Sequence, residues 1–241
     1  MKLHRRIAGM LGYELIKRRK LNDTLDQHLN NVIRQENINL IVDVGANAGQ
    51  YARSLRLHGY AGKIESFEPL GSAFEELKAE SNLDPSWRSY QLALGAENKV
   101  VTMHCYASSD FSSVLAVNGF ARDRFKWRTD LDGTEEVQMQ RLADVWPAIV
   151  EFIETPRCLL KLDTQGFDLE VLAGAGDALD QIYAIQAEIS LKSIYDGAPR
   201  YLDALAEFES HGFEITGMYP VSRDKQTLAI VEYDCVMTRR L

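Results

Sequence analysis

The stretch LIVDVGANAGQYARSL, positions 40–55, restricts the fold more than any other part of the chain. Four of its first five residues are apolar, which predicts a buried strand, and a glycine-rich turn then leads into a run with helical spacing. The same alternation continues to the C-terminus and is typical of a parallel sheet with helices on both faces. We therefore expect one doubly wound α/β domain over residues 39–241, preceded by a helical extension over residues 1–38.

Strands are expected where short apolar runs are bounded by turn residues, and helices where apolar residues recur every three or four positions. The expected strands are Leu40–Val44, Lys63–Phe67, Trp87–Leu94, Val100–Tyr106, Glu136–Met139, Cys158–Leu162, Tyr183–Ile189, Phe213–Met218 and Leu228–Val236. The expected helices are Gly49–His58, Ser72–Glu80, Phe167–Ala173 and Tyr201–His211. The stretch from Ser108 to Gly133 interrupts the alternation, and we expect a loop or flap there.

The composition fits a soluble globular protein, with 46% hydrophobic residues, 26% charged residues and no apolar run long enough for a membrane span. Three cysteines far apart in sequence and the lack of a secretory signal lead us to expect a cytoplasmic location. The formal net charge of -8 argues against bulk nucleic-acid binding. The first segment is nevertheless basic, with Lys2, Arg5, Arg6, Lys17, Arg18, Arg19 and Lys20.

Two interpretations of this basic segment are open. It forms a helix that packs on the main domain, or on a second subunit in a homodimer, and leaves its charges in water. Alternatively, it docks on a membrane surface or on a partner protein.

The turn after the first strand favours a ligand without a phosphate. A dinucleotide site needs glycines in the GxGxxG spacing, because the pyrophosphate must lie against the helix N-terminus. Here the pattern reads GANAGQ, with Asn47 and Gln50 in place of two glycines. S-adenosylmethionine fits better, since its charged amino-acid end suits Asp43 and backbone carbonyl groups. Glu68 follows the turn at the spacing expected of a ribose acceptor.

Three stretches in order, VDVGANAGQYA, SFEPL and LLKLDTQGFDLEVLAGA, resemble the FkbM-type methyltransferase family, and AEIS and HGF follow in the expected order. The resemblance covers roughly residues 38–217. It implies a class I methyltransferase fold with a mostly parallel seven-stranded sheet, S-adenosylmethionine as donor, and methylation of a hydroxyl oxygen, often on a sugar or natural product. Family members often read DVEG where this chain has DTQG, so Gln165 replaces a carboxylate.

Carried over by position, the resemblance assigns the cofactor residues. Asp43, Gly45, Asn47 and Gly49 would line the methionine part, Glu68 would hold the ribose, and Ala93 and Leu94, ending the third strand, would border the adenine. Tyr51 and Pro69, which belong to the same motifs, complete the set of cofactor-binding candidates.

Methyl transfer to a hydroxyl group benefits from a general base or from a metal that lowers the hydroxyl pKa. Asp163 and Glu188 end neighbouring predicted strands, so both are candidates for the base or for Mg²⁺ ligands, and an inward-facing structural pair is an equal alternative. Gln165 is a candidate for orienting the acceptor, or else it holds the turn. Of the five histidines, only His104 is kept as a catalytic candidate, and a structural role is the favoured alternative for it as for the other four.

The Ser108 to Gly133 stretch supplies candidate contacts for a small-molecule acceptor, or alternatively forms an ordinary exposed loop. The hydroxyl candidates are Ser109, Ser112 and Ser113, the stacking candidates are Phe120, Phe125 and Trp127, and the anion-binding candidates are Arg122, Arg124, Lys126 and Arg128.

The sequence thus predicts an S-adenosylmethionine-dependent O-methyltransferase acting on a saccharide or a saccharide-containing small molecule. The open alternatives are a nicotinamide-dependent oxidoreductase and a non-catalytic cofactor-binding interaction protein.

Overall fold

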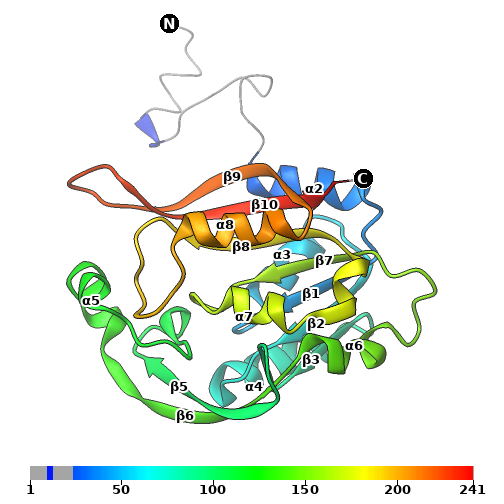
Figure 1. Ribbon diagram of the computed structural model, residues 1–241, viewed down its shortest axis with the longest axis horizontal. Coiled ribbons are helices and arrows are strands. Elements are labelled where there is room, and N and C mark those ends of the chain that lie inside the picture. The colour runs from blue at the N-terminus through cyan, green and yellow to red at the C-terminus, as the bar shows by residue number, and fades with distance from the viewer. Residues whose placement is uncertain (1–9, 13–23, 241) are drawn as a thin grey trace, which may run out of the picture.

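A computed structural model of the chain describes residues 10–12 and 24–240. Its main layer is a seven-stranded sheet in the order β3-β2-β1-β7-β8-β10-β9 (Figure 1). The strands are β1 (Leu40–Val44), β2 (Lys63–Phe67), β3 (Trp87–Tyr90), β7 (Cys158–Leu162), β8 (Ile182–Ser190), β9 (Phe213–Arg223) and β10 (Ile230–Arg239). The first five along the sheet pair in parallel, whereas β10 is antiparallel to both β8 and β9. This mostly parallel, Rossmann-like sheet confirms the expected fold class.

The strand order reverses between β1 and β7. From β1 the chain builds outward through β2 to β3, and it then returns to place β7 on the other side of β1. In an open parallel sheet, ligands bind beyond the carboxyl ends of the strands at such a reversal. The ends of β1 and β7 therefore mark the position of the candidate site.

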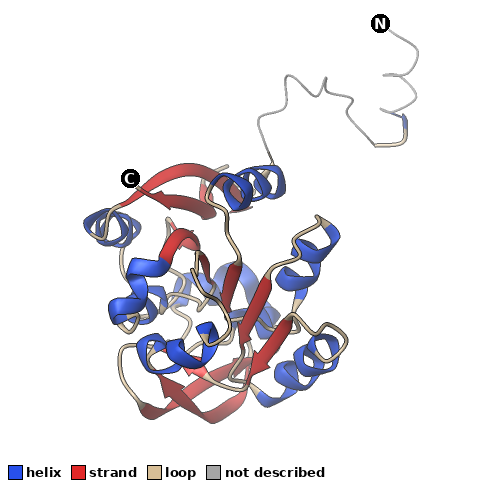
Figure 2. Cartoon of the chain, turned by 90° about the vertical axis from the view of Figure 1, so that its right-hand side faces the viewer, coloured by secondary structure: helices blue, strands red, loops and turns tan. Residues whose placement is uncertain are grey.

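Helices cover both faces of this sheet (Figure 2). One face packs on α2 (Leu25–Gln35), α3 (Gln50–Leu57) and α4 (Gly71–Ser81). The other face packs on α6 (Leu142–Val150), α7 (Asp168–Ala173), η4 (Gly176–Gln181) and α8 (Tyr201–Ser210). Successive residues of a strand point to opposite faces of the sheet. Ile41 therefore packs in the core on the α2, α3 and α4 side, whereas Val42 and Val44 pack in the core on the α6, α7 and α8 side.

A second sheet of three strands, in the order β4-β6-β5, lies beside the main one. It comprises β4 (Ala93–Leu94), β5 (Lys99–Tyr106) and β6 (Leu131–Gln140). The expected strand Trp87–Leu94 was therefore wrong in its continuity: it divides after Tyr90, and Ala93 and Leu94 join the second sheet. The expected loop after Ser108 was also wrong in part, because it contains η2 (Ser109–Phe111), α5 (Gly119–Phe125) and η3 (Lys126–Thr129).

In the N-terminal extension, the structure describes residues 10–12 and the segment from Thr24 onward, which contains α2. Thr24 caps this helix through a capping box, in which its side chain accepts from the Gln27 N–H and the Gln27 side chain accepts from the Thr24 N–H. Its buried face packs against β9 and β10, where His28 Nδ1 lies 2.6 Å from the Tyr219 hydroxyl. The predicted basic helix lies mainly outside the described residues.

Within the described residues, no helix is long and apolar enough to cross a membrane.

Candidate functional site

The glycine turn after β1 is held in place by two neighbouring strands. The Gly45 and Ala46 N–H groups donate to the Phe67 carbonyl at 3.0 Å, and the Asp163 N–H donates to the Val44 carbonyl at 3.0 Å. Gly45 has φ +76°, and a Cβ there would lie 2.0 Å from the Asp163 carbonyl oxygen. Only glycine fits this position, because the backbone here has a left-handed conformation and lies against the end of β7.

Glu68 connects this turn to the start of α4. Its Oε2 accepts from the Asn47 N–H and its Oε1 accepts from the Leu70 N–H, each at 2.9 Å. The side chain is 6% exposed, and burial raises the pKa of its carboxyl to about 7 although the two N–H donors lower it. Each oxygen keeps a further lone pair, so the carboxylate can still accept from a ligand hydroxyl.

Lys161 lies between two carboxylates beneath the turn. Its Nζ is 2.8 Å from Asp163 Oδ2 and 3.7 Å from Asp43 Oδ1. Burial alone would lower the pKa of this lysine, but the charges of Asp163 and Asp43 outweigh burial and raise it. Asp43 is itself fully buried, and burial raises its pKa against the effect of Lys161. Asp43 therefore faces Lys161 under the turn, whereas Asp163, with a side chain 30% exposed, reaches the cavity.

Gln165 links Asp163 to the neighbouring loops. Its Nε2 donates to Asp163 Oδ1 at 2.7 Å, and its Oε1 accepts from the Tyr195 hydroxyl at 2.8 Å. The Ser113 hydroxyl donates to the Gln165 carbonyl at 3.0 Å. Both oxygens of Asp163 thus have partners, one in Lys161 and one in Gln165, and the Gln165 backbone has φ +55°.

Three carboxyl groups gather where β8 meets β10. Glu188 of β8 lies directly opposite Asp234 of β10, and Glu232 projects on the same face of β10. Burial, and then the charges of Asp163 and Glu232, raise the pKa of Glu188. Glu232 is 7% exposed and accepts from the Ser222 hydroxyl at 2.6 Å.

Four residues of the site were not predicted from the sequence: Lys161, Tyr195, Glu232 and Asp234. The sequence pattern does indicate the last two, because acids at alternate positions of an otherwise apolar strand point to the same face. The signal was not used because the antiparallel pairing of β10 was not foreseen.

A cavity of about 340 Å³ opens over the ends of β1, β2, β7 and β8. Nine of the predicted site residues line it: Gly45, Asn47, Glu68, Pro69, Ala93, Leu94, Asp163, Gln165 and Glu188. The segment between β5 and β6 forms one wall, through Ser109, Ser112, Phe125 and Arg128 among others. This wall brings serine hydroxyls and an aromatic ring to the cavity.

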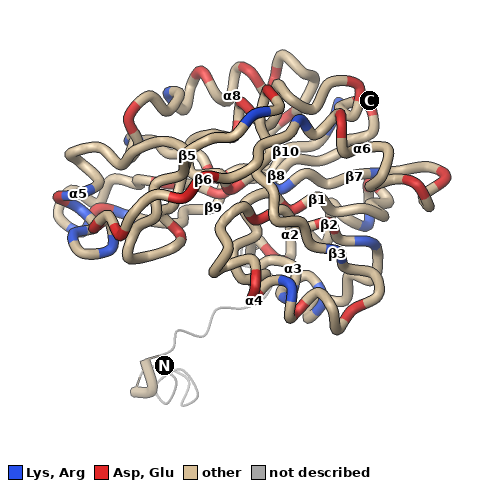
Figure 3. Tube along the Cα trace, turned by 90° about the horizontal axis from the view of Figure 1, so that it is seen from below, with Lys and Arg blue, Asp and Glu red and all other residues tan. Residues whose placement is uncertain are grey.

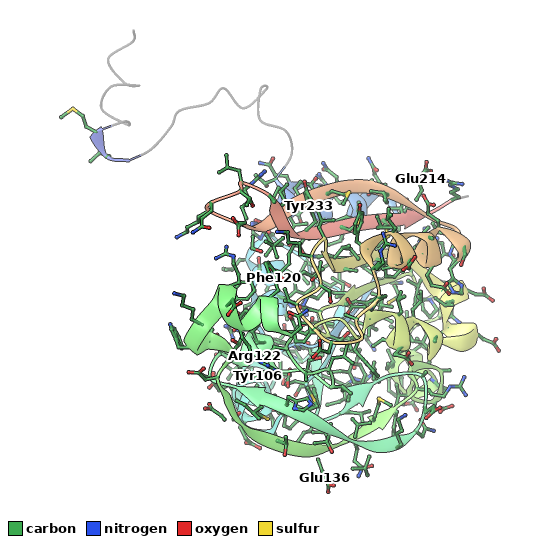
Figure 4. All side chains as sticks on the ribbon, turned by 60° about the vertical axis from the view of Figure 1, so that its left-hand side comes forward. Tyr106, Phe120, Arg122, Glu136, Glu214 and Tyr233 are labelled. Atoms are coloured by element: carbon green, nitrogen blue, oxygen red, sulfur yellow. The ribbon has the colours of Figure 1, made fainter. Side chains whose placement is uncertain are left out.

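Other predicted residues of this segment lie elsewhere. Phe120 and Arg122 are on α5, near the hairpin of β9 and β10 (Figure 4). Arg124 donates to the Arg223 carbonyl of that hairpin at 2.6 Å. Trp127 is 66% exposed.

The basic residues of α5 and η3 gather at one end of the molecule (Figure 3). Among them, Arg128 lines the cavity and is paired with Asp110. Its charge is therefore already partly balanced within the protein.

A second cavity of about 340 Å³ lies on the α2 and α3 side of the sheet. It shares Gly45, Asn47, Asp110, Asp163 and Glu188 with the first cavity, so the two meet at the strand ends. Tyr51 lines this second cavity, and its buried hydroxyl has no hydrogen-bond partner in the described part of the chain.

Three predicted site residues line neither cavity: Asp43, which faces Lys161 under the turn, Gly49 and His104. Gly49 has φ +81° and approaches the Trp87 side chain, where an added Cβ would lie 2.8 Å from the ring. His104 exchanges backbone hydrogen bonds with Ser113 at 2.8 and 3.2 Å. Within the described residues, no group of three or more His, Cys, Asp or Glu is arranged to hold a metal ion.

Residues 43–215 match the family described as Methyltransferase FkbM domain. No curated protein sequence matches the chain at a significant level. Among solved structures, the chain is similar to an rRNA methylase from Streptococcus thermophilus, with 11% identity, a TM-score of 0.45 and coverage of 92% of this chain and 99% of the other.

The precorrin-6y C5,15-methyltransferase from Geobacter metallireducens is 10% identical, with a TM-score of 0.44 and coverage of 95% of each chain. A fibrillarin/Nop5p complex gives 11% identity, a TM-score of 0.46 and coverage of 84% of this chain and 73% of the other. Because these TM-scores are below 0.5, the family assignment rests on the sequence match, which spans more than two thirds of the chain.

Proposed function

The chain belongs to the Methyltransferase FkbM domain family, and we propose that it transfers the methyl group of S-adenosylmethionine to a hydroxyl oxygen of a saccharide or saccharide-containing small molecule. Membership of this family makes the chain a methyltransferase. We infer the methyl donor, the acceptor and the reacting oxygen from the site. The family match leaves the nicotinamide-dependent alternative without support.

The position of Glu68 is the observation that carries the donor assignment. A buried carboxylate at the end of β2 faces the cavity and retains free lone pairs after accepting two backbone N–H groups. A ribose diol supplies two hydroxyl donors, which match such an acceptor. Gly45 and Asn47 would then border the amino-acid end, with Ala93 and Leu94 beside the adenine.

The bound donor would supply a methyl group already activated by a positively charged sulfur. The protein then has to position the acceptor oxygen and remove its proton. We assign the proton to Asp163, because this carboxylate reaches the cavity while Lys161 and Gln165 fix its orientation. A carboxylate is a weak base toward an alcohol, so the proton would leave as the new C–O bond forms rather than before it.

The neighbouring side chains support Asp163 in this role. Gln165, held by Tyr195, restricts the rotation of the carboxylate. Ser109, Ser112 and Phe125 of the cavity wall suit the hydroxyl groups and the apolar face of a sugar ring.

The residues present do not fit a magnesium site. Each oxygen of Asp163 already accepts one hydrogen bond, from Lys161 or from Gln165, and within the described residues no group of three or more His, Cys, Asp or Glu is arranged to hold a metal ion. No step of the proposal therefore depends on Mg²⁺. Equal turnover in EDTA and in MgCl₂ is expected.

Turnover tests the proposal. The protein is incubated with S-adenosylmethionine and a panel of saccharides and glycosylated metabolites, and formation of S-adenosylhomocysteine is measured by mass spectrometry. We expect acceptor-dependent product with the added methyl group on oxygen. A protein that binds S-adenosylhomocysteine but methylates no hydroxyl in the panel would favour the non-catalytic cofactor-binding alternative.

A further inference from the structure

The carboxyl groups of Glu188, Glu232 and Asp234, here called the acidic trio, form no ion pair with a cation of the described residues. Glu188 and Asp234 are cross-strand partners, an arrangement in which like charges repel. Within the part of the chain that the structure describes, no lysine or arginine forms an ion pair with any of the three. The charge of Lys161 lowers the pKa of Asp234, but its ammonium group is bonded to Asp163 and lies 3.7 Å from Asp43.

Among the described residues, neighbouring acids add to this repulsion. After burial, the neighbours that raise the pKa of Glu188 are the carboxylates Asp163, Glu232 and Asp234. Burial also raises the pKa of Asp234. Buried carboxylates that repel one another favour either a bound proton or a bound cation.

An unpartnered acceptor lies next to the acidic trio. Gln186 is 3% exposed and donates its Nε2 to Asp234 Oδ1 at 2.9 Å, whereas its buried Oε1 has no hydrogen-bond partner among the residues that the structure describes. Gln186, Glu188 and Asp234 all line the second cavity. This wall of the second cavity thus combines negative charge with an oxygen acceptor, and both features favour a ligand with positively charged N–H donors.

The acidic trio lies beyond the position assigned to the methyl donor. Two strand spacings, together about 10 Å, separate β1 from β8, which carries Glu188, and three, about 14 Å, separate it from β10, which carries Glu232 and Asp234. The donor is placed at β1 and β2, and the second cavity extends from Gly45 and Asp163 toward Asp234. A group that reaches the acidic trio therefore belongs to the acceptor.

We propose, on the premise of the methyl-transfer function above, that the acceptor carries a protonated amine, as an aminosugar does, and that the acidic trio and Gln186 bind its ammonium group. The amine anchors the acceptor and does not react. The methyl group still goes to a hydroxyl oxygen beside Asp163.

Glucosamine and glucose make a matched pair of probes, because they differ only in an ammonium group in place of one hydroxyl. Each is titrated by ligand-observed NMR into the full chain, in the presence of S-adenosylhomocysteine. A single charge at about 4 Å from a partly screened carboxylate supports at least a tenfold preference for glucosamine. Equal binding of the two sugars, or no binding of glucosamine, would overturn the inference.

Two variants locate the effect. Asp234→Asn keeps the oxygen that accepts from Gln186, and Glu232→Gln keeps an oxygen for Ser222, so each removes charge with little change in shape. Both should reduce the preference to below threefold, and the second variant serves if the first does not fold. Asp203→Asn, on the exposed face of α8, is the control and should keep the preference. A preference that persists in both trio variants would contradict the assignment.

Two further arms separate the other outcomes. If MgCl₂ displaces glucosamine from the wild type, and Asp234→Asn no longer binds Mg²⁺, the acidic trio is a metal site and the inference fails. Calorimetry with S-adenosylhomocysteine on the same samples tests the premise. Binding of this product without an amine preference removes only the further inference, whereas absence of its binding removes the proposed function.

Discussion

Gly45→Ala is the substitution for which the structure gives the clearest expected magnitude. The new Cβ would lie 2.0 Å from the Asp163 carbonyl oxygen, so the ends of β1 and β7 would have to separate by more than 1 Å. The residue would also keep φ +76°, which costs an L residue about 1–2 kcal/mol. Relieving the overlap adds about 1–3 kcal/mol by the usual cost of overpacking.

Gly59→Ala is the matched control. Gly59 has φ +91° but no atom within 4 Å of an added Cβ, so this variant carries the backbone strain without the overlap. Urea denaturation should therefore show a further loss of about 1–3 kcal/mol in Gly45→Ala relative to Gly59→Ala. For a chain of this length, each 1 kcal/mol lowers Tm by about 2–4 °C.

Ligand binding provides the second measurement on the same pair. Displacement of the turn in Gly45→Ala should lower the affinity for S-adenosylhomocysteine by about 100-fold. A misplacement of about 1 Å at a preorganised site has an effect of that size. Gly59→Ala should bind normally. Equal stability losses in the two variants, together with unchanged affinity in Gly45→Ala, would refute the close approach between β1 and β7.

Three further predictions concern the charged groups. Glu68→Gln should weaken S-adenosylhomocysteine by about 10–100-fold in calorimetry, because hydrogen bonds to a charged acceptor contribute about 1.5–3 kcal/mol, while Glu75→Gln on the exposed face of α4 should not. Wild-type affinity should fall about tenfold from pH 8 to pH 6, since the ligand needs the ionised form of Glu68, whose pKa of about 7 means that it gains a proton as the pH falls. A pH profile that is equally steep in Glu68→Gln would contradict this origin. Lys161→Met should lower stability by about 3–5 kcal/mol by leaving Asp43 buried without its cation, and adding Asp43→Asn should restore part of it in chemical denaturation.

The sequence was sufficient for the elements whose pattern is local. The strands Leu40–Val44, Lys63–Phe67 and Cys158–Leu162 occur as predicted, because each is a short apolar run bounded by turn residues. α6 was not predicted, since Pro147 lies within it and proline usually interrupts a helix. The second sheet was also missed, because pairing between β4, β5 and β6 depends on contacts between distant segments.

The site follows the same division. The residues of the glycine turn and Glu68 could be predicted from the sequence, because they occupy fixed positions after two strands. Nothing in the sequence around Lys161 distinguishes it from an exposed lysine. Its position between Asp43 and Asp163 depends on the pairing of β1 with β7. Likewise, Glu188 and Asp234 become neighbours only through the antiparallel register of β8 and β10.

Calorimetric titration of the full chain with S-adenosylhomocysteine, with NAD as the control ligand, tests the central claim most directly. We expect one site with micromolar affinity for S-adenosylhomocysteine and no heat of binding with NAD. A folded protein that binds NAD, or that leaves S-adenosylhomocysteine unbound at millimolar concentration, would contradict the proposed methyl donor.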